Sequence, residues 1–208
     1  MGPIFFNIYT NDLPNVLKNC NIAMYADDVS MFLKHKDSKK LFQLLQIDLN
    51  NISDWYASNH LAINIKKSNF IIFTKKMIYN PTIQAINNSN LKLSINNIQL
   101  DCMKETKYLG LLIDFSLSWE NHIININKKI NKQIGILYKI RHLLPISTRL
   151  TFYYANINSH LIYALPIWGA NYKCKLKAIV LAQKRAIRLI DGASYLAHTN
   201  SIYTHMKF

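Results

Sequence analysis

The first half of the chain is patterned mainly as strands. Residues 22–33 are apolar on both sides of an acidic centre, which predicts two short buried strands joined by a tight turn. Residues 37–60 carry apolar side chains at helical spacing, with Asp37 and Ser38 suited to cap the helix and Asn59-His60 to end it. The other elements expected here are a helix or buried strand at 4–13, strands at 61–65 and 70–73, a polar loop at 77–99 with a short hairpin around Asn96-Asn97, and a buried strand at 108–114.

The second half changes to helical spacing. Apolar residues recur every three or four positions from Trp119 to Leu137, which predicts a long amphipathic helix. Pro145 interrupts the pattern, Ser147 is suited to cap a second helix that runs to about residue 163, and a third helix ends at Gly192. Strands followed by helices indicate an α+β fold in two parts, 1–115 and 116–208. We expect an antiparallel sheet with packed helices in the first part and helices alone in the second.

The two parts differ in charge. The whole chain has a net charge of +14, from 25 Lys and Arg against 11 Asp and Glu. Residues 116–190 contain twelve basic residues and one acid, Glu120, whereas residues 1–115 contain twelve basic and nine acidic residues. Nucleic acid is the usual partner of so basic a surface, although ribosome-associated and membrane-surface proteins share the signature. The helical part is therefore the part expected to face a polyanion.

The remaining composition is typical of a folded intracellular protein. Half of the residues are hydrophobic and only 17% are charged, which favours a folded chain. The three cysteines have neither zinc-finger nor disulfide spacing, so we expect reduced thiols that behave as small buried residues. The first residues lack the basic region of a signal peptide, and the apolar runs are too short to cross a bilayer. We expect a cytoplasmic or nuclear protein that is not secreted and has no membrane partner.

The acidic centre of residues 22–33 is Tyr25-Ala26-Asp27-Asp28. Two adjacent carboxylates between apolar strands would be costly to bury without compensation, which divalent cations supply. Mg²⁺ prefers one or two carboxylates together with substrate phosphates, and two such ions roughly 4 Å apart stabilise the attacking and leaving oxygens of an in-line displacement. The alternative is an exposed Asp-Asp turn, which is common. Because chance gives this tetrapeptide with odds on the order of one in a thousand, we favour the metal site.

Tyr25-Ala26-Asp27-Asp28 between apolar strands resembles the catalytic hairpin of reverse transcriptases, and its surroundings are similar to the non-LTR retrotransposon branch. The matching segments cover nearly the whole chain in the order that the family has them. They are Gly2-Pro3-Ile4-Phe5-Phe6 through Leu13-Pro14, Leu61-Ala62-Ile63-Asn64 to Lys67-Ser68 with Ile71-Ile72-Phe73, Lys107-Tyr108-Leu109-Gly110 to Asp114, Leu117-Ser118-Trp119 with His122, Tyr153-Tyr154, Trp168-Gly169, and Gln183 to Arg188.

The resemblance implies a partial polymerase palm in residues 1–115 and a helical thumb or connection region in residues 116–208. It also implies RNA-directed DNA polymerisation as the ancestral activity, with an RNA template, a DNA primer and deoxynucleotides as partners and Mg²⁺ as cofactor. In the family, another metal-binding aspartate lies in an earlier palm strand, and the fingers also come first. Neither has a counterpart before Gly2. We therefore expect a C-terminal fragment that is catalytically incomplete by itself.

The resemblance also assigns roles to residues. Asp27 matches the family's metal ligand and Asp28 its neighbour, which contributes less directly, so both are candidate catalytic and metal-binding residues. Tyr25 and Ala26 match positions beside the primer end or the sugar of the incoming nucleotide. Lys67, a third candidate catalytic residue, matches a basic residue near the triphosphate that donates a proton to pyrophosphate. A solvated turn lysine explains Lys67 equally well.

Six basic residues of the helical part are candidates for nucleic-acid binding: Lys128, Lys129, Lys132, Lys184, Arg185 and Arg188. The alternative is a solvated helical face, but the charge asymmetry favours phosphate contact. Two other interpretations of the whole chain stay open. One is a non-catalytic remnant that binds nucleic acid through its basic helices, and the other is an unstable product without function.

Overall fold

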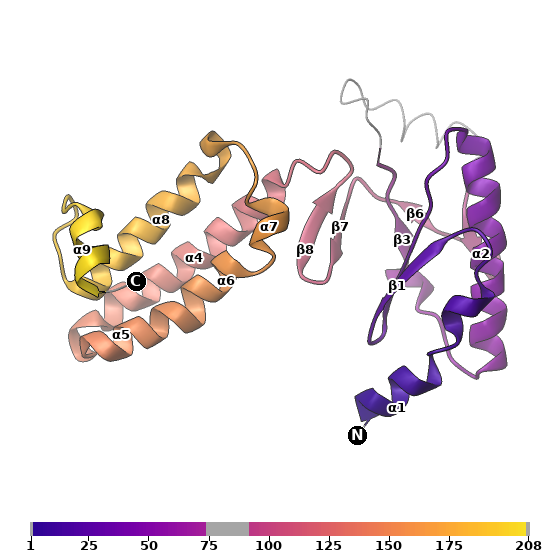
Figure 1. Cartoon of the computed structure of the whole chain (residues 1–208), viewed down its shortest axis with the longest axis horizontal. Coiled ribbons are helices and arrows are strands. Elements are labelled where there is room, and N and C mark those ends of the chain that lie inside the picture. The colour runs from indigo at the N-terminus through magenta and orange to yellow at the C-terminus, as the bar shows by residue number, and fades with distance from the viewer. Residues whose placement is uncertain (1, 74–91, 207–208) are drawn as a thin grey trace. The chain divides into compact units, whose positions relative to one another are not determined.

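The computed structural model describes residues 2–73 and 92–206 of the 208-residue chain. They form mixed helix and strand, as the α+β expectation requires, and the chain divides into two compact units, Met1–Gly110 and Leu111–Phe208 (Figure 1). Each unit has its own buried apolar side chains. The two units are therefore described separately.

The first unit is built around one long helix and several short strand pairs. Strands β1 and β2 pair antiparallel, as do β4 and β5, whereas β3 and β6 pair parallel over two residues each. In chain order its elements are α1 (Gly2–Tyr9), the 3₁₀ turn η1 (Leu13–Val16), β1 (Asn21–Tyr25), β2 (Asp28–Phe32), α2 (Ser38–Ser58), the 3₁₀ turn η2 (Ile65–Lys67), β3 (Asn69–Phe70), β4 (Ser94–Ile95), β5 (Ile98–Gln99), β6 (Asp101–Cys102) and β7 (Glu105–Tyr108).

Helix α2 confirms the prediction for residues 37–60. The Asp37 side chain accepts a hydrogen bond from the Lys39 backbone N–H at 2.9 Å, and Asn59 follows the last helical residue. Its apolar stripe faces two clusters. Phe42 and Leu49 pack with Ile95 of β4 and with Leu93 and Leu100, which flank the β4–β5 hairpin. Ile52 and Trp55 pack under the β1–β2 hairpin. The helix therefore joins the short strands into one unit.

Two strand predictions are wrong. Residues 61–65 are not a strand but run into η2, and only Asn69–Phe70 of the following segment pairs. The strand expected at 108–114 is broken by Leu109 and Gly110, which both have positive φ, 45° and 83°. Because Gly adopts this conformation at little cost, the chain turns there and separates β7 from β8 (Leu111–Asp114). In the described residues the strands therefore form separate two-stranded sheets instead of the one antiparallel sheet that we expected.

The short hairpin around Asn96-Asn97 is confirmed. Ser94 faces Gln99 and Ile95 faces Ile98 across a two-residue turn. Asn96 and Asn97 have φ values of 50° and 62°, the pair of left-handed residues that a type I′ turn requires and that Asn tolerates better than other residues. Residues 77–91 of the expected polar loop lie outside the described residues.

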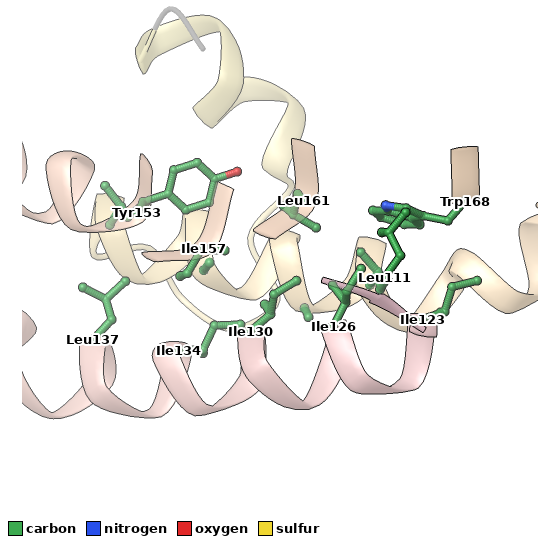
Figure 2. Close-up of a cluster of buried hydrophobic side chains, with 14 residues drawn as sticks. Leu111, Ile123, Ile126, Ile130, Ile134, Leu137, Tyr153, Ile157, Leu161 and Trp168 are labelled. Carbon is green, nitrogen blue, oxygen red and sulfur yellow. The ribbon is translucent and has the colours of Figure 1, made fainter. Parts of the chain in front are cut away.

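The second unit is helical apart from β8. Its helices are α4 (Glu120–Ile140), the 3₁₀ turn η3 (Arg141–Leu143), α5 (Ile146–Tyr153), the π-helical turn η4 (Tyr154–Asn158), α6 (Ser159–Ile162), α7 (Leu165–Trp168), α8 (Lys173–Asp191) and α9 (Thr199–Met206). The predicted stripe of α4 is confirmed, since Ile123, Ile126, Ile130, Ile134 and Leu137 are all buried. Figure 2 shows these side chains pointing toward those of Tyr153, Ile157 and Leu161.

The second predicted helix is confirmed in extent but not in its start or regularity. It begins at Ile146, directly after Pro145, and no side chain caps it, so Ser147 lies inside the helix. Between Tyr154 and Asn158 the helix widens into a π turn, which holds one residue more than an α turn. The third helix ends as predicted at Gly192, whose φ is 80°.

Asp114 fixes the passage from β8 into α4. Its carboxylate accepts hydrogen bonds from the backbone N–H groups of Ser116, Ser118 and Trp119 and from both serine hydroxyls. Leu117 and Trp119 hold positive φ values of 54° and 60° within this turn, a conformation that costs free energy for bulky residues. The ionised form of Asp114 stabilises the strained turn, and although burial acts to raise the pKa of Asp114, these hydrogen bonds hold it below its ordinary value.

Two further expectations concern the cysteines and the membrane. The three cysteines form no disulfide, but Cys20 and Cys102 are only partly buried and Cys174 is exposed. No helix within residues 2–73 and 92–206 is long and apolar enough to span a bilayer.

Asp48 is the one acid of α2 that lies completely buried, with 0% of its surface exposed. Its two oxygens accept hydrogen bonds from the backbone N–H groups of Lys18, Asn19 and Cys20, at 3.1, 2.8 and 2.7 Å. Burial acts to raise the pKa of Asp48, but these N–H donors outweigh it and hold the pKa below its ordinary value. Burial, aided by Asp48, raises the pKa of the Cys20 thiol to about 12, so that thiol stays protonated.

We expect Asp48→Asn to lower the free energy of unfolding by about 2–4 kcal/mol, because an amide NH₂ would face backbone donors and leave buried N–H groups unpaired. Since the pKa of folded Asp48 lies below its ordinary value of 3.8, its contribution is present above about pH 4 and is lost as pH falls through the folded pKa. The difference between the native chain and the variant should therefore shrink below that pH.

Urea unfolding at pH 7 and pH 3, with amide hydrogen exchange of residues 18–20, checks this prediction. Asp54→Asn, at an exposed acid of the same helix, is the matched control. A pH-independent difference between Asp48→Asn and the native chain, or unchanged exchange at residues 18–20, would contradict it.

Candidate functional site

The Tyr25-Ala26-Asp27-Asp28 motif forms the closed end of the β1–β2 hairpin, as predicted. Tyr25 pairs with Asp28, and the two-residue turn between them consists of Ala26 and Asp27. Ala26 has a φ of 52°, which a residue with a side chain rarely adopts. Strained backbone of this kind concentrates at functional sites, where the surrounding structure holds it in place.

The two faces of the hairpin have different surroundings. Ile22, Met24, Val29 and Met31 lie on one face and pack on the cluster that contains Leu13, Ile52 and Trp55. The other face carries Tyr25 and its partner Asp28 and is open, with the Tyr25 side chain 67% exposed. The apolar face therefore anchors the hairpin while the carboxylates stay accessible to a ligand.

The loop before β1 connects this hairpin to α2. Because residues 18–20 donate their backbone N–H groups to Asp48, the chain enters β1 at a fixed place on the helix. The segment further upstream is also attached, since the Trp55 indole N–H donates to the Asp12 carboxylate at 3.3 Å. Two contacts with α2, at residues 18–20 and at Asp12, thus fix the segment that leads to the Asp27-Asp28 pair.

Asp27 and Asp28 offer hard oxygen ligands of the kind that Mg²⁺ prefers. Neither side chain takes part in a described hydrogen bond or ion pair, so both oxygens of each are available. Among the described residues, however, no group of three His, Cys, Asp or Glu side chains gathers at one place. The pair therefore fits part of a divalent-cation site, which phosphate oxygens or a further carboxylate would complete.

Lys67 lies in the 3₁₀ turn η2 and is exposed. No hydrogen bond or ion pair in the described part of the chain connects it to the hairpin. The structure thus brings Tyr25, Ala26, Asp27 and Asp28 together and leaves Lys67 on a neighbouring turn of the same unit. Both interpretations of Lys67, as a phosphate contact and as a solvated lysine, stay open.

The six basic candidates lie on two helices of the second unit that pack against each other. Lys128, Lys129 and Lys132 are exposed on α4, and Lys184, Arg185 and Arg188 lie on α8. None of the six forms an ion pair in the described part of the chain. Arg185 and Arg188 line an open pocket of about 560 Å³, whereas the three α4 lysines lie outside it. Five of the candidates therefore occupy two places, an α4 lysine face and a pocket, while Lys184 lies on α8 outside the pocket.

Two residues of the pocket were not singled out by the sequence. Tyr138 and Arg141 also line the pocket, with the Arg141 guanidinium 4.0 Å from the centre of the Tyr138 ring. Their spacing of three on a helix is the signal that could have identified the pair. His122 is buried between Trp119 and Trp168, and burial, followed by the charge of Lys129, holds the pKa of His122 below its ordinary value.

The chain is similar in sequence to known proteins. The family described as reverse transcriptase (RNA-dependent DNA polymerase) matches residues 1–113, which include the hairpin. The whole chain is 24% identical to a "Probable RNA-directed DNA polymerase from transposon X-element" of Drosophila melanogaster and 26% identical to an "RNA-directed DNA polymerase from mobile element jockey" of Drosophila funebris. It covers 22% and 23% of the length of these two relatives, so it spans less than a quarter of each.

No solved structure matches the chain. The family match covers more than half of the chain, and it falls on the segment in which Asp27 and Asp28 end a strained, well-anchored hairpin. The chain belongs to the reverse transcriptase (RNA-dependent DNA polymerase) family.

Proposed function

We propose that the chain is the part of an RNA-directed DNA polymerase that contains the carboxylate hairpin of the palm and the nucleic-acid-binding thumb. The observation that carries the proposal is the exposed Asp27-Asp28 pair at the end of an antiparallel hairpin, within the segment that matches the family. In this reaction a primer 3′-hydroxyl attacks the α-phosphate of a deoxynucleoside triphosphate, the bond to the β-phosphate oxygen breaks and pyrophosphate leaves. This transfer needs positioning and charge stabilisation more than covalent chemistry.

The hairpin residues suit the positioning part of this reaction. Asp27 and Asp28 would hold Mg²⁺, which when bound neutralises phosphate charge and polarises the reacting oxygens. Tyr25 lies on the same open face as Asp28, where its ring can lie against the sugar of the primer end or of the incoming nucleotide. The fixed, strained turn at Ala26 keeps these groups in one arrangement without rearrangement during the reaction.

The second unit suits contact with the nucleic-acid backbone. Residues 116–190 have a net charge of +11, and the exposed lysines of α4 offer point charges to phosphates without an evident base reader. This surface is also what favours the second candidate function, a nucleic-acid-binding remnant without catalysis. The two candidates differ in whether Asp27 and Asp28 matter for function.

Metal binding at the hairpin is the first expectation. Mn²⁺ should broaden the NMR signals of residues 25–28 selectively, and added deoxynucleoside triphosphate should tighten binding because its phosphates complete the coordination. Asp27→Asn should weaken Mn²⁺ binding by about tenfold or more, while Asp101→Asn, at an exposed acid elsewhere in the unit, should not. Broadening that is centred elsewhere or survives Asp27→Asn would exclude the hairpin as a metal site.

Primer extension is the second expectation. The 208-residue chain alone should not extend a DNA primer on an RNA template with Mg²⁺ or Mn²⁺ beyond the level of Asp27→Ala. The described residues supply only two carboxylates at the hairpin, and losing one part of a cooperating site costs nearly as much as losing all of it. Extension by the native chain that Asp27→Ala lacks would show that a further carboxylate, from a second copy or from outside the described residues, completes the site.

Salt-dependent binding is the third expectation. The chain should bind RNA and DNA with little sequence preference, and affinity should fall steeply with salt because bound lysines release counterions. Changing Lys128, Lys129 and Lys132 together to Ala should lower the slope of log affinity against log salt by about one per lysine that contacts phosphate. Changing Lys36, Lys39 and Lys40 to Ala removes equal charge from the first unit as a control. Fluorescence anisotropy at several salt concentrations measures both slopes, and equal slopes would contradict the assignment.

A further inference from the structure

The pocket between α4 and α8 has a composition that differs from the lysine face beside it. Its volume of about 560 Å³ is within the usual range for small-ligand sites. Six of its lining residues carry the argument: Gly135, Tyr138, Arg141, Arg185, Arg188 and Tyr195. They combine three guanidinium groups, two aromatic rings and a position without a side chain. We call this set the arginine–tyrosine pocket.

The three guanidinium groups have N–H donors that no described hydrogen bond or ion pair uses. None forms an ion pair in the described part of the chain, and Asp191, the acid nearest in sequence to Arg188, is not among the lining residues. Arg188 donates from Nε to the Ala197 carbonyl at 2.8 Å, and Arg185 only reaches Asn131 Oδ1 at 3.5 Å. Arg141 lies over the Tyr138 ring. Most N–H groups of this cluster therefore have no described protein acceptor, and phosphate oxygens match the planar fork of arginine.

The two tyrosines offer exposed ring surface at the same place. Tyr138 is 56% exposed and Tyr195 is 72% exposed, although both line the pocket. Gly192, with φ at 80°, turns the chain after α8 so that residues 193–195 reach the pocket. A Cβ added at Gly135 would meet nothing within 4 Å, so the α4 wall is open there. The pocket thus has room between a charged edge and two stacking surfaces.

We propose that the arginine–tyrosine pocket binds an unpaired nucleotide of a single-stranded nucleic acid. Arg185 and Arg188 bind its phosphate, and the base stacks on Tyr138 or Tyr195. Stacking on aromatic side chains beside a basic groove is how proteins hold single strands without reading sequence. A duplex keeps its bases stacked on one another and cannot enter in this way. The proposal rests on nucleic-acid binding by the second unit but does not need the carboxylate hairpin.

The pocket and the α4 lysine face therefore bind different features of a nucleic acid. The lysines contact phosphates of single strands and duplexes alike, whereas the pocket favours strands whose bases are free. The chain should thus hold a junction, with the duplex on the lysine face and the adjoining single strand in the pocket. This preference for unpaired strand is the property that distinguishes the proposal from general electrostatic binding.

The test compares a labelled oligothymidylate with a hairpin duplex of the same charge, by fluorescence anisotropy on the full 208-residue chain. Alanine at the tyrosine that carries the base, in Tyr195→Ala or in Tyr138→Ala, should weaken single-strand binding about 5- to 100-fold and leave duplex binding within about twofold, whereas Tyr195→Phe should bind normally because the ring remains. Tyr172→Ala is the matched control, since Tyr172 is 76% exposed in the same unit and does not line the pocket. Arg185→Gln should lower the single-strand salt slope by about 0.7.

A second readout does not depend on affinity. Oligonucleotides carrying 5-bromodeoxyuridine should photo-crosslink to Tyr138 or Tyr195, as mass spectrometry of the cross-linked peptides would show. Unchanged single-strand binding by both alanine variants, or equal loss for single strand and duplex, would overturn the pocket. If the native chain binds neither nucleic acid at low salt, the proposed function fails with it. Salt-dependent binding of both with normal tyrosine variants would overturn the pocket alone.

Discussion

The buried carboxylate of Asp48 is the interaction on which the first unit depends. An ionised group without surface exposure is stable only if hydrogen bonds replace its water, and here three consecutive backbone N–H groups do so. Those groups belong to the loop that leads into β1, so satisfying the charge also fixes the loop on α2. The apolar face of the hairpin then packs on the same helix, and the exposed Asp27-Asp28 pair takes its position from both contacts.

In the second unit the carboxylate of Asp114 holds the backbone in the same way. There the carboxylate also receives three backbone N–H groups, from Ser116, Ser118 and Trp119, and the turn that it orders leads into α4, the helix whose stripe forms the core. In each unit one carboxylate accepts hydrogen bonds from a short irregular segment and so fixes the place at which the next strand or helix begins. The few acids of this basic chain therefore have separate tasks: Asp48 and Asp114 hold the backbone, whereas Asp27 and Asp28 remain available to a ligand.

Sequence patterns predicted the elements whose signals are local. The hairpin at 22–33, the caps of α2, the Asn96-Asn97 turn and the stripe of α4 follow from spacing and turn chemistry that neighbouring residues determine. The predictions of the short strands were wrong because a two-residue pairing depends on partners far away in the sequence. Asn69–Phe70, for example, pairs with Asp101–Cys102. Asp48 stood on the apolar stripe of its predicted helix, but its partners thirty residues earlier have no local signal. The arginine–tyrosine pocket likewise combines α4, α8 and the 193–195 loop, which only packing brings together.

The π turn at Tyr154–Asn158 keeps the helical segments on either side of it in register with α4. It inserts one extra residue between Tyr153, which packs on α4 before it, and Leu161, which packs on α4 after it. The wider turn absorbs this residue; if the same residues continued as a regular α-helix, the extra residue would rotate the following segment by about 100°. Leu161 would then leave the core and a neighbour would face it instead. Deleting one residue at this turn would therefore leave the later side chains facing α4, whereas deleting one from a regular stretch of helix would shift the register of everything that follows.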